Sequence, residues 1–112
     1  MPLFVISLAV LWAAAVAMPH ASDRGQGDAA KTYAGKCAMC HGVAGAGNGA
    51  AAAALDPKPT DFTTAEFQRG RTDEEIVAAI KDGRGAMPAY GSQLSAEAIK
   101  GLVAYLRSFG PR

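Results

Sequence analysis

Two cysteines and a histidine lie close together in this chain of 112 residues, in the order Cys37-Ala38-Met39-Cys40-His41. Two thiols one helical turn apart, followed directly by an imidazole, form the attachment pattern of a c-type haem. In such a site each thiol forms a thioether to one vinyl group of the porphyrin, and the imidazole lies beneath the iron. The spacing therefore predicts one covalently bound haem c, attached through Cys37 and Cys40 and ligated by His41.

Other uses of the two thiols explain fewer of these residues. A structural zinc site requires four ligands, and the only further histidine, His20, lies near a predicted cleavage point. A dithiol redox site is expected at the start of a helix within a βαβ unit, and the sequence shows no convincing strand. A plain disulfide or two free thiols also stay open. The motif and its context favour haem attachment over these three alternatives.

An iron with one histidine ligand has an open sixth position unless a second side chain fills it. Of the four methionines, Met1 and Met18 belong to an apolar leader or its end, and Met39 lies inside the attachment turn. Met87 remains, in Gly85-Ala86-Met87-Pro88, where glycine permits close backbone approach and proline fixes φ. We expect Met87 to be the second axial ligand, with core packing as the alternative. His/Met ligation leaves no vacant coordination site, so it favours an electron carrier over an enzyme.

The apolar segment at the start of the chain indicates where in the cell the protein is expected. Residues 3–18 carry no charged side chain, and Ala15-Val16-Ala17 has the small-residue pattern of a cleavage site. The apolar run is shorter than the ~20 residues that a membrane-spanning helix needs. We predict a signal peptide over residues 1–17, with an uncleaved anchor or a helix buried in the fold as alternatives. The first two imply export, most simply to a bacterial periplasm, with membrane contact only through a retained leader or a membrane-bound redox complex.

The rest of the chain predicts a flexible lead-in at 18–27 and one helical domain at 28–110. Apolar residues recur at three- and four-residue intervals over 28–39, which indicates a first helix. The stretch 43–71 is rich in Gly, Ala and Pro and is expected to be irregular, with a possible short helix at 50–55. A loop of this length in a small domain usually serves a site.

Two further helices are indicated by their capping residues. Thr72 followed by Glu75 has the form of a capping box, and Gly83 supplies the stop of that helix. Ser95 caps the last helix, whose apolar period continues until Gly110. The expected fold class is therefore all-α.

The composition agrees with a bound cofactor and excludes one class of partner. Half of the residues are hydrophobic by type, but many of these are alanine, so a core of side chains alone would be small. A porphyrin would supply the missing apolar surface. The formal net charge is only +1, with 11 basic and 10 acidic residues interspersed, which argues against binding to nucleic acid.

Together these segments resemble the small class I cytochromes c, particularly bacterial monohaem cytochromes similar to the haem c subunits of terminal oxidases. The resemblance covers about residues 26–109. Its anchors are Cys-Ala-Met-Cys-His-Gly at 37–42, Asp-Pro-Lys-Pro-Thr-Asp-Phe-Thr at 56–63, Gly-Ala-Met-Pro-Ala-Tyr-Gly at 85–91 and Leu-Val-Ala-Tyr-Leu at 102–106. The resemblance implies three or four helices wrapped around one haem c, with Tyr33 and Tyr105 at the contact of the first and last helices. Family members often have glycine at this crossing, where this chain has Ala29 and offers Gly101 instead.

The resemblance also implies a function. We expect single-electron transfer between periplasmic or respiratory redox proteins, with Pro88 and Tyr90 shaping the methionine loop. Many family members orient the axial imidazole with the carbonyl of a proline, but residues 48–51 of this chain read Asn-Gly-Ala-Ala, so the acceptor stays open. The alternatives are a relay subunit tethered to a larger redox complex and a peroxidase-type enzyme in which Met87 leaves the iron.

Overall fold

The computed structural model describes residues 2–5, 7, 9–10, 12–13 and 21–111. Its elements are α1 (Ala21–Lys36), α2 (Ala38–His41), the 3₁₀ helix η1 (Ala52–Ala54), α3 (Ala65–Gly70), α4 (Asp73–Asp82) and α5 (Ala96–Arg107). No strand occurs within the described ranges, where a single isolated bridge pairs Arg84 with Met87. The all-α class is confirmed, with five α-helices among the described residues where the sequence predicted three or four.

The described residues of the leader contribute nothing to the core. The described residues between 2 and 13 are exposed and belong to no helix, so they do not form the buried helix considered as an alternative. The predicted cleavage point after Ala17 lies outside the described residues. Among the helices that are described, none has the length and hydropathy needed to cross a membrane.

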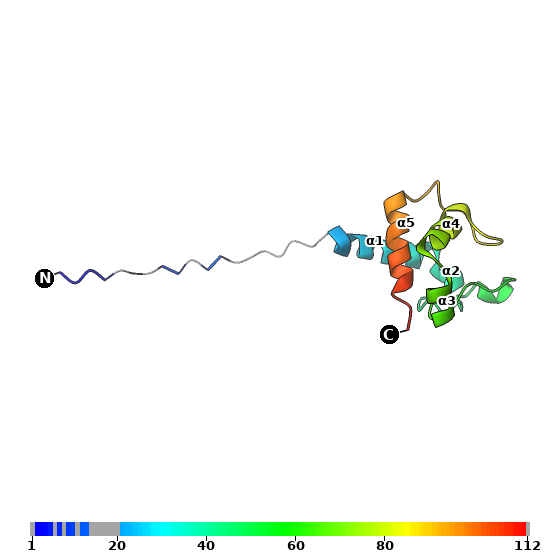
Figure 1. Ribbon diagram of the computed structural model, residues 1–112, viewed down its shortest axis with the longest axis horizontal. Helices are drawn as coiled ribbons and strands as arrows, with labels where there is room; N and C mark the ends of the chain where they lie inside the picture. The colour runs from blue at the N-terminus through cyan, green and yellow to red at the C-terminus, as the bar shows by residue number, and fades with distance from the viewer. Residues whose placement is uncertain (1, 6, 8, 11, 14–20, 112) are drawn as a thin grey trace.

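The first and last helices cross and form the centre of the domain (Figure 1). A Cβ atom placed on Gly101 of α5 would lie 3.5 Å from the carbonyl oxygen of Gly25 and 3.8 Å from Cβ of Ala29. The rings of Tyr33 and Tyr105 lie 5.2 Å apart between their centroids, as the resemblance implied. The buried core comprises Ala29, Tyr33, Phe62, Ile76, Ile80, Ile99, Leu102, Val103 and Leu106.

The first helix begins earlier than its sequence pattern indicates. The lead-in was expected to be irregular up to residue 27, yet α1 starts at Ala21 and continues through Gly25 and Gly27. Glycine inside a helix costs about 1 kcal/mol relative to alanine, so local propensity opposes this extension. The backbone of Gly25 lies against α5 at Gly101, and this tertiary contact offsets the local preference.

The predicted capping residues perform their expected roles. The Thr72 hydroxyl accepts a hydrogen bond from the Glu75 amide, and the Glu75 carboxylate accepts one from the Thr72 amide, which completes a capping box at the start of α4. Ser95 accepts from the amide of Ala98 at the start of α5. Gly83 follows the last residue of α4 with a φ of 76°.

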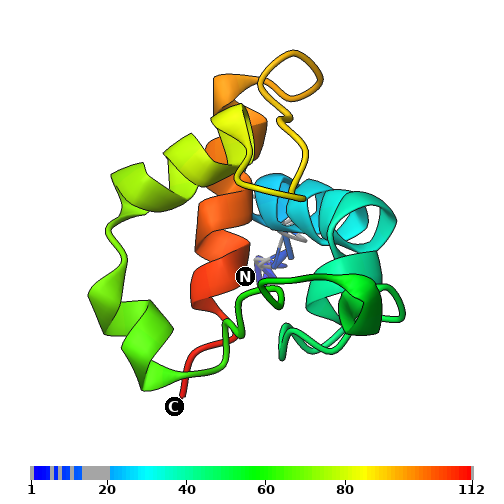
Figure 2. The same cartoon turned by 90° about the vertical axis from the view of Figure 1, so that its right-hand side faces the viewer.

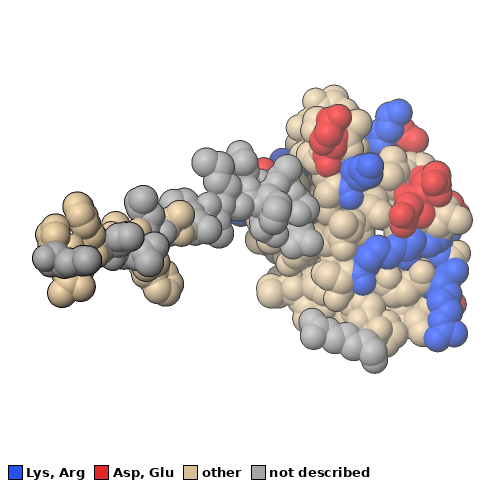
Figure 3. All heavy atoms as spheres, turned by 60° about the vertical axis from the view of Figure 1, so that its left-hand side comes forward, with Lys and Arg blue, Asp and Glu red and all other residues tan. Residues whose placement is uncertain are grey.

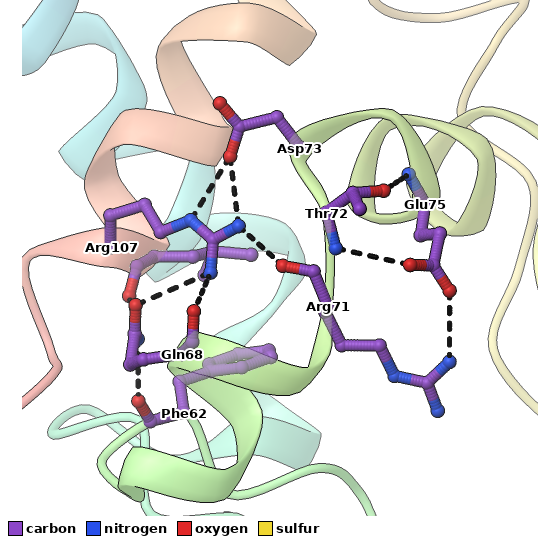
Figure 4. Close-up of polar contacts among 8 residues, drawn as sticks. Phe62, Gln68, Arg71, Thr72, Asp73, Glu75 and Arg107 are labelled. Atoms are coloured by element: carbon purple, nitrogen blue, oxygen red, sulfur yellow. Dashed lines mark hydrogen bonds and ion pairs between the residues drawn. The ribbon is translucent and has the colours of Figure 1, made fainter.

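Helix α3 was not predicted, because residues 43–71 read as irregular. It begins after Thr64, whose hydroxyl accepts from the amide of Phe67. Arg107, the last residue of α5, connects this helix to the next one (Figure 4): its guanidinium donates to the backbone oxygens of Gln68 and Arg71 and to the carboxylate of Asp73. One side chain thus joins α3, α4 and α5.

Candidate functional site

The two cysteines lie on a single tight turn, with Cys37 between α1 and α2 and Cys40 inside α2. Cys37 is the N-cap of α2, and its carbonyl oxygen accepts from the amides of Cys40 (3.2 Å) and His41 (2.9 Å). The amide of Cys37 itself donates to the carbonyl of Tyr33 in α1. Both thiols are free and half-buried. Burial raises the pKa of Cys37, against the opposing effect of the nearby Lys36 ammonium.

His41 is oriented by a backbone carbonyl from a distant segment. Its Nδ1 lies 3.1 Å from the carbonyl oxygen of Thr60. Because a carbonyl can only accept, Nδ1 carries the proton, and Nε2 keeps its lone pair for a metal. The imidazole also stacks on Phe62 at 4.5 Å between centroids. Burial lowers the pKa of His41, while the bond to Thr60 acts in the opposite direction, so the neutral form that ligates metals is favoured.

The segment that carries Thr60 is secured by close packing beside the attachment turn. The amide of Phe62 donates to the carbonyl of Gly45 at 2.7 Å. Gly45 has a φ of 75°, and a Cβ atom there would lie 2.8 Å from the ring of Phe109. A side chain at this position would therefore separate the loop from the core. Thr60 and Phe62 were not predicted as parts of the site, although both fall in the segment 56–63 that supported the resemblance.

Met87 lies in the loop between α4 and α5, half-buried and packed against the same hydrophobic core as Cys37. Its amide donates to the carbonyl of Arg84, and its own carbonyl accepts from the amide of Arg84, so the two residues close a tight turn. Figure 2 shows the loop after α4 passing over α1, and Tyr90 of this loop is hydrogen-bonded to Lys36, the last residue of α1. The structure thus places the predicted second ligand in a turn of its own, in a loop that reaches the helix preceding Cys37.

Tyr90 links this loop to the attachment turn. Its hydroxyl donates to the carbonyl oxygen of Lys36, the residue before Cys37, at 3.2 Å. Burial raises the pKa of Tyr90, and the proximity of Cys37 and Cys40 acts in the same direction. The predicted role of Tyr90 in shaping the methionine loop therefore has a structural basis in this contact.

The available donors fit a haem c rather than a bare metal ion. Two free thiols share one turn, a neutral imidazole keeps Nε2 available, and a thioether lies on a separate loop. In the part of the chain that the structure describes, no group of three or more His, Cys, Asp or Glu side chains is arranged to bind a metal ion. This helical fold and this donor set define the class of the protein as a c-type cytochrome.

Comparison with known families leads to the same class. The family model described as "Cytochrome C oxidase, cbb3-type, subunit III" matches residues 25–106. The chain belongs to this family of c-type cytochromes. It therefore carries one covalent haem c and functions in electron transfer, not as an enzyme.

The individual relatives include a cytochrome c6 and a subunit of a cytochrome c oxidase. The chain is 35% identical over 80 residues to cytochrome c6 of Bryopsis maxima, which covers 69% of this chain and 83% of that protein. It is 35% identical over 82 residues to the cbb3-type cytochrome c oxidase subunit FixP of Azorhizobium caulinodans, which covers 72% of this chain but only 26% of FixP. The similarity to FixP is therefore confined to a minor part of that subunit.

Solved structures show the same fold. The c-type cytochrome KustC0563 superimposes with a TM-score of 0.67 at 32% identity, covering 75% of this chain and 99% of that one. A chain of the Kuenenia stuttgartiensis reducing HAO-like protein complex Kustc0457/Kustc0458 superimposes with a TM-score of 0.63 at 27% identity, covering 74% and 41% respectively.

Proposed function

We propose that this chain is an exported one-electron carrier in which Cys37 and Cys40 bind haem c through thioethers, and His41 and Met87 are the axial ligands of its iron. The observation that carries the proposal is the hydrogen bond between Nδ1 of His41 and the carbonyl oxygen of Thr60. It fixes the tautomer and the ring orientation that metal ligation through Nε2 requires.

When bound, the haem supplies an iron that gains and loses a single electron. The carbonyl of Thr60 makes His41 a more basic ligand and prevents its ring from rotating. The thioether of Met87 is a soft donor that favours the reduced iron and raises the reduction potential. With His41 and Met87 both holding the iron, a substrate would have no coordination site, which agrees with a carrier.

The expected partners are other redox proteins. Basic and acidic side chains lie next to one another over α3, α4 and the following loop, and Figure 3 shows both signs interspersed on the visible face. Electrostatic steering of a partner should therefore be modest and only weakly dependent on salt. Short-lived encounters between electron-transfer proteins often bury less than ~1,200 Å² of surface, so such a surface suffices.

We place the protein outside the cytoplasm, in the bacterial periplasm, because the apolar leader has the length and small-residue pattern of an export signal. The match to part of FixP supports a second version, in which the chain is a relay subunit tethered by residues 3–18. N-terminal sequencing of the mature protein decides between them. A mature chain starting at Met18 supports the free carrier, and retention of residues 1–17 supports the tethered relay.

The ligand assignment is tested on exported protein expressed with haem-maturation machinery. We expect colour that stays with the polypeptide in acid-acetone and a ferric spectrum containing a sulfur-to-iron charge-transfer band. Met87→Ala should abolish this band and open the iron to added imidazole. The matched control is Met39→Ala, since Met39 is 64% exposed. Extractable colour refutes the thioethers, and a band that survives Met87→Ala refutes the ligand.

A further inference from the structure

The methionine loop is joined to the end of α1 by three contacts that involve only three residues. The hydroxyl of Tyr90 donates to the carbonyl oxygen of Lys36 at 3.2 Å. The ammonium of Lys36 donates to Oε1 of Gln93 at 3.2 Å. The same ammonium lies 5.9 Å from the centroid of the Tyr90 ring, within the range of a cation–π contact. Lys36 precedes Cys37 directly, so these contacts connect the loop to the attachment turn.

The backbone hydrogen bonds of the loop connect it to α4 and to itself. The amides of Tyr90 and Gly91 donate to the carbonyls of Ile80 and Lys81, which secures the loop to the end of α4. The amide of Leu94 donates to the carbonyl of Tyr90 and closes a turn within the loop. Among the described polar contacts, those of Lys36 with Tyr90 and Gln93 are the ones that link the loop to α1.

We propose that Tyr90, Lys36 and Gln93 form a clasp that keeps the methionine loop closed, and that this clasp sets how often Met87 leaves the iron. The inference deepens the proposed function and rests on Met87 being the axial ligand. The three clasp residues are positioning residues, because they act on the loop that carries Met87 and not on the iron itself.

The size of the effect follows from the nature of the contacts. Both hydrogen bonds are exposed, and a hydrogen bond of this kind changes an equilibrium by about 2- to 10-fold. An added ligand such as imidazole binds the iron only in the fraction of molecules in which Met87 has dissociated. Its apparent affinity is therefore proportional to that open fraction. Removing one clasp contact should raise the apparent affinity for imidazole by the same 2- to 10-fold.

The test is a titration of ferric holoprotein with imidazole, followed by the loss of the sulfur-to-iron band. The clasp variants are Tyr90→Phe, which removes only a hydroxyl, Gln93→Ala and Lys36→Met. The matched controls are Tyr105→Phe, which removes a tyrosine hydroxyl from α5, and Lys31→Met, which removes an exposed ammonium from α1. We expect tighter imidazole binding in the three clasp variants and unchanged binding in the two controls.

A second measurement separates the clasp from a general loss of stability. Urea midpoints of unfolding should differ little between Tyr90→Phe and Tyr105→Phe, whereas their imidazole affinities should differ several-fold. A normal sulfur-to-iron band with equal imidazole affinity in wild type, Tyr90→Phe and Gln93→Ala overturns the clasp and leaves the ligand assignment intact. A wild-type ferric protein without that band overturns the Met87 ligation, and the clasp as a control of that ligand fails with it.

Discussion

The buried hydroxyl of Tyr33 donates a 2.6 Å hydrogen bond to the carbonyl oxygen of Gly42, the residue that directly follows His41. The ring of Tyr33 also packs at 5.2 Å from those of Tyr105 and Phe109. One side chain of the first helix therefore contacts both the end of the attachment turn and the last helix. The position of His41 depends on the same crossing of terminal helices that forms the core.

Replacing Tyr33 by Phe should destabilise the holoprotein by about 1–2 kcal/mol, because the buried carbonyl of Gly42 loses its partner while the ring packing is kept. Urea unfolding measured at neutral pH checks this value. Tyr105→Phe is the control, since it removes a hydroxyl from the ring that packs on Tyr33. Equal midpoints for both variants would show that the bond to Gly42 contributes nothing.

The same hydroxyl should make the protein sensitive to alkali. Burial raises the pKa of Tyr33 to about 12 from the ordinary value of 10.0. A raised pKa means that the folded state favours the neutral phenol. Its contribution to stability is therefore complete below pH 10 and is lost as the pH rises from 10 to about 12. Unfolding free energies measured across this range should fall more steeply for wild type than for Tyr33→Phe.

Two glycines near the core should respond to alanine in opposite ways. Gly45→Ala should cost at least about 2 kcal/mol, because φ is 75° and the new methyl group would lie 2.8 Å from the ring of Phe109. Gly101→Ala should stabilise α5 by about 0.5–1 kcal/mol, because its Cβ meets neighbours at 3.5 Å and 3.8 Å, which is ordinary contact. Thermal unfolding of the two holoproteins measures both effects. Destabilisation by Gly101→Ala would mean that α1 and α5 lie too close together at Gly101 to accommodate a methyl group.

Arg107→Lys should destabilise the protein by about 1–3 kcal/mol although the charge is kept. The planar guanidinium donates at once to Asp73 and to the carbonyls of Gln68 and Arg71 (Figure 4). A lysine ammonium cannot donate to all three acceptors from one position. Arg69→Lys is the matched control, because Arg69 is exposed on α3. Denaturant midpoints compare the two variants. An equal cost in both variants would show that the contacts of the Arg107 guanidinium contribute nothing specific.

The parts of the fold that sequence could predict are those with local signals. Thr72, Ser95 and Gly83 have short-range chemistry that starts or stops a helix, and all three perform it in the structure. Helix α3 was missed because its apolar content is little more than Phe67, so its short helix shows no period. The early start of α1 was missed because it depends on the contact with Gly101, which is far away in the sequence.

The candidate site likewise contains residues that the sequence could predict and one contact that it could not. Cys37, Cys40 and His41 were predicted from adjacent residues, and the structure places them on one turn. The partner of His41 is a backbone carbonyl, at Thr60, and every residue type has one, so no residue pattern could identify it. Met87 was reached by elimination among the methionines, and its ligation stays a prediction.

The loop between His41 and Thr60 is bonded to the attachment turn at several points before η1. Gly47 donates to the carbonyl of His41 at 2.7 Å, and Ala51, directly before η1, donates to that of Met39 at 2.9 Å, whereas Ala53 and Ala54 are exposed. Lengthening a loop whose ends are held is inexpensive, at about 0.6 kcal/mol per doubling. New sequence inserted at the exposed Ala53 and Ala54 would leave the bonds of Gly47 and Ala51 to the attachment turn, and with them His41, in place. This region is thus a natural place to graft a recognition peptide that redirects the carrier to a chosen electrode or enzyme.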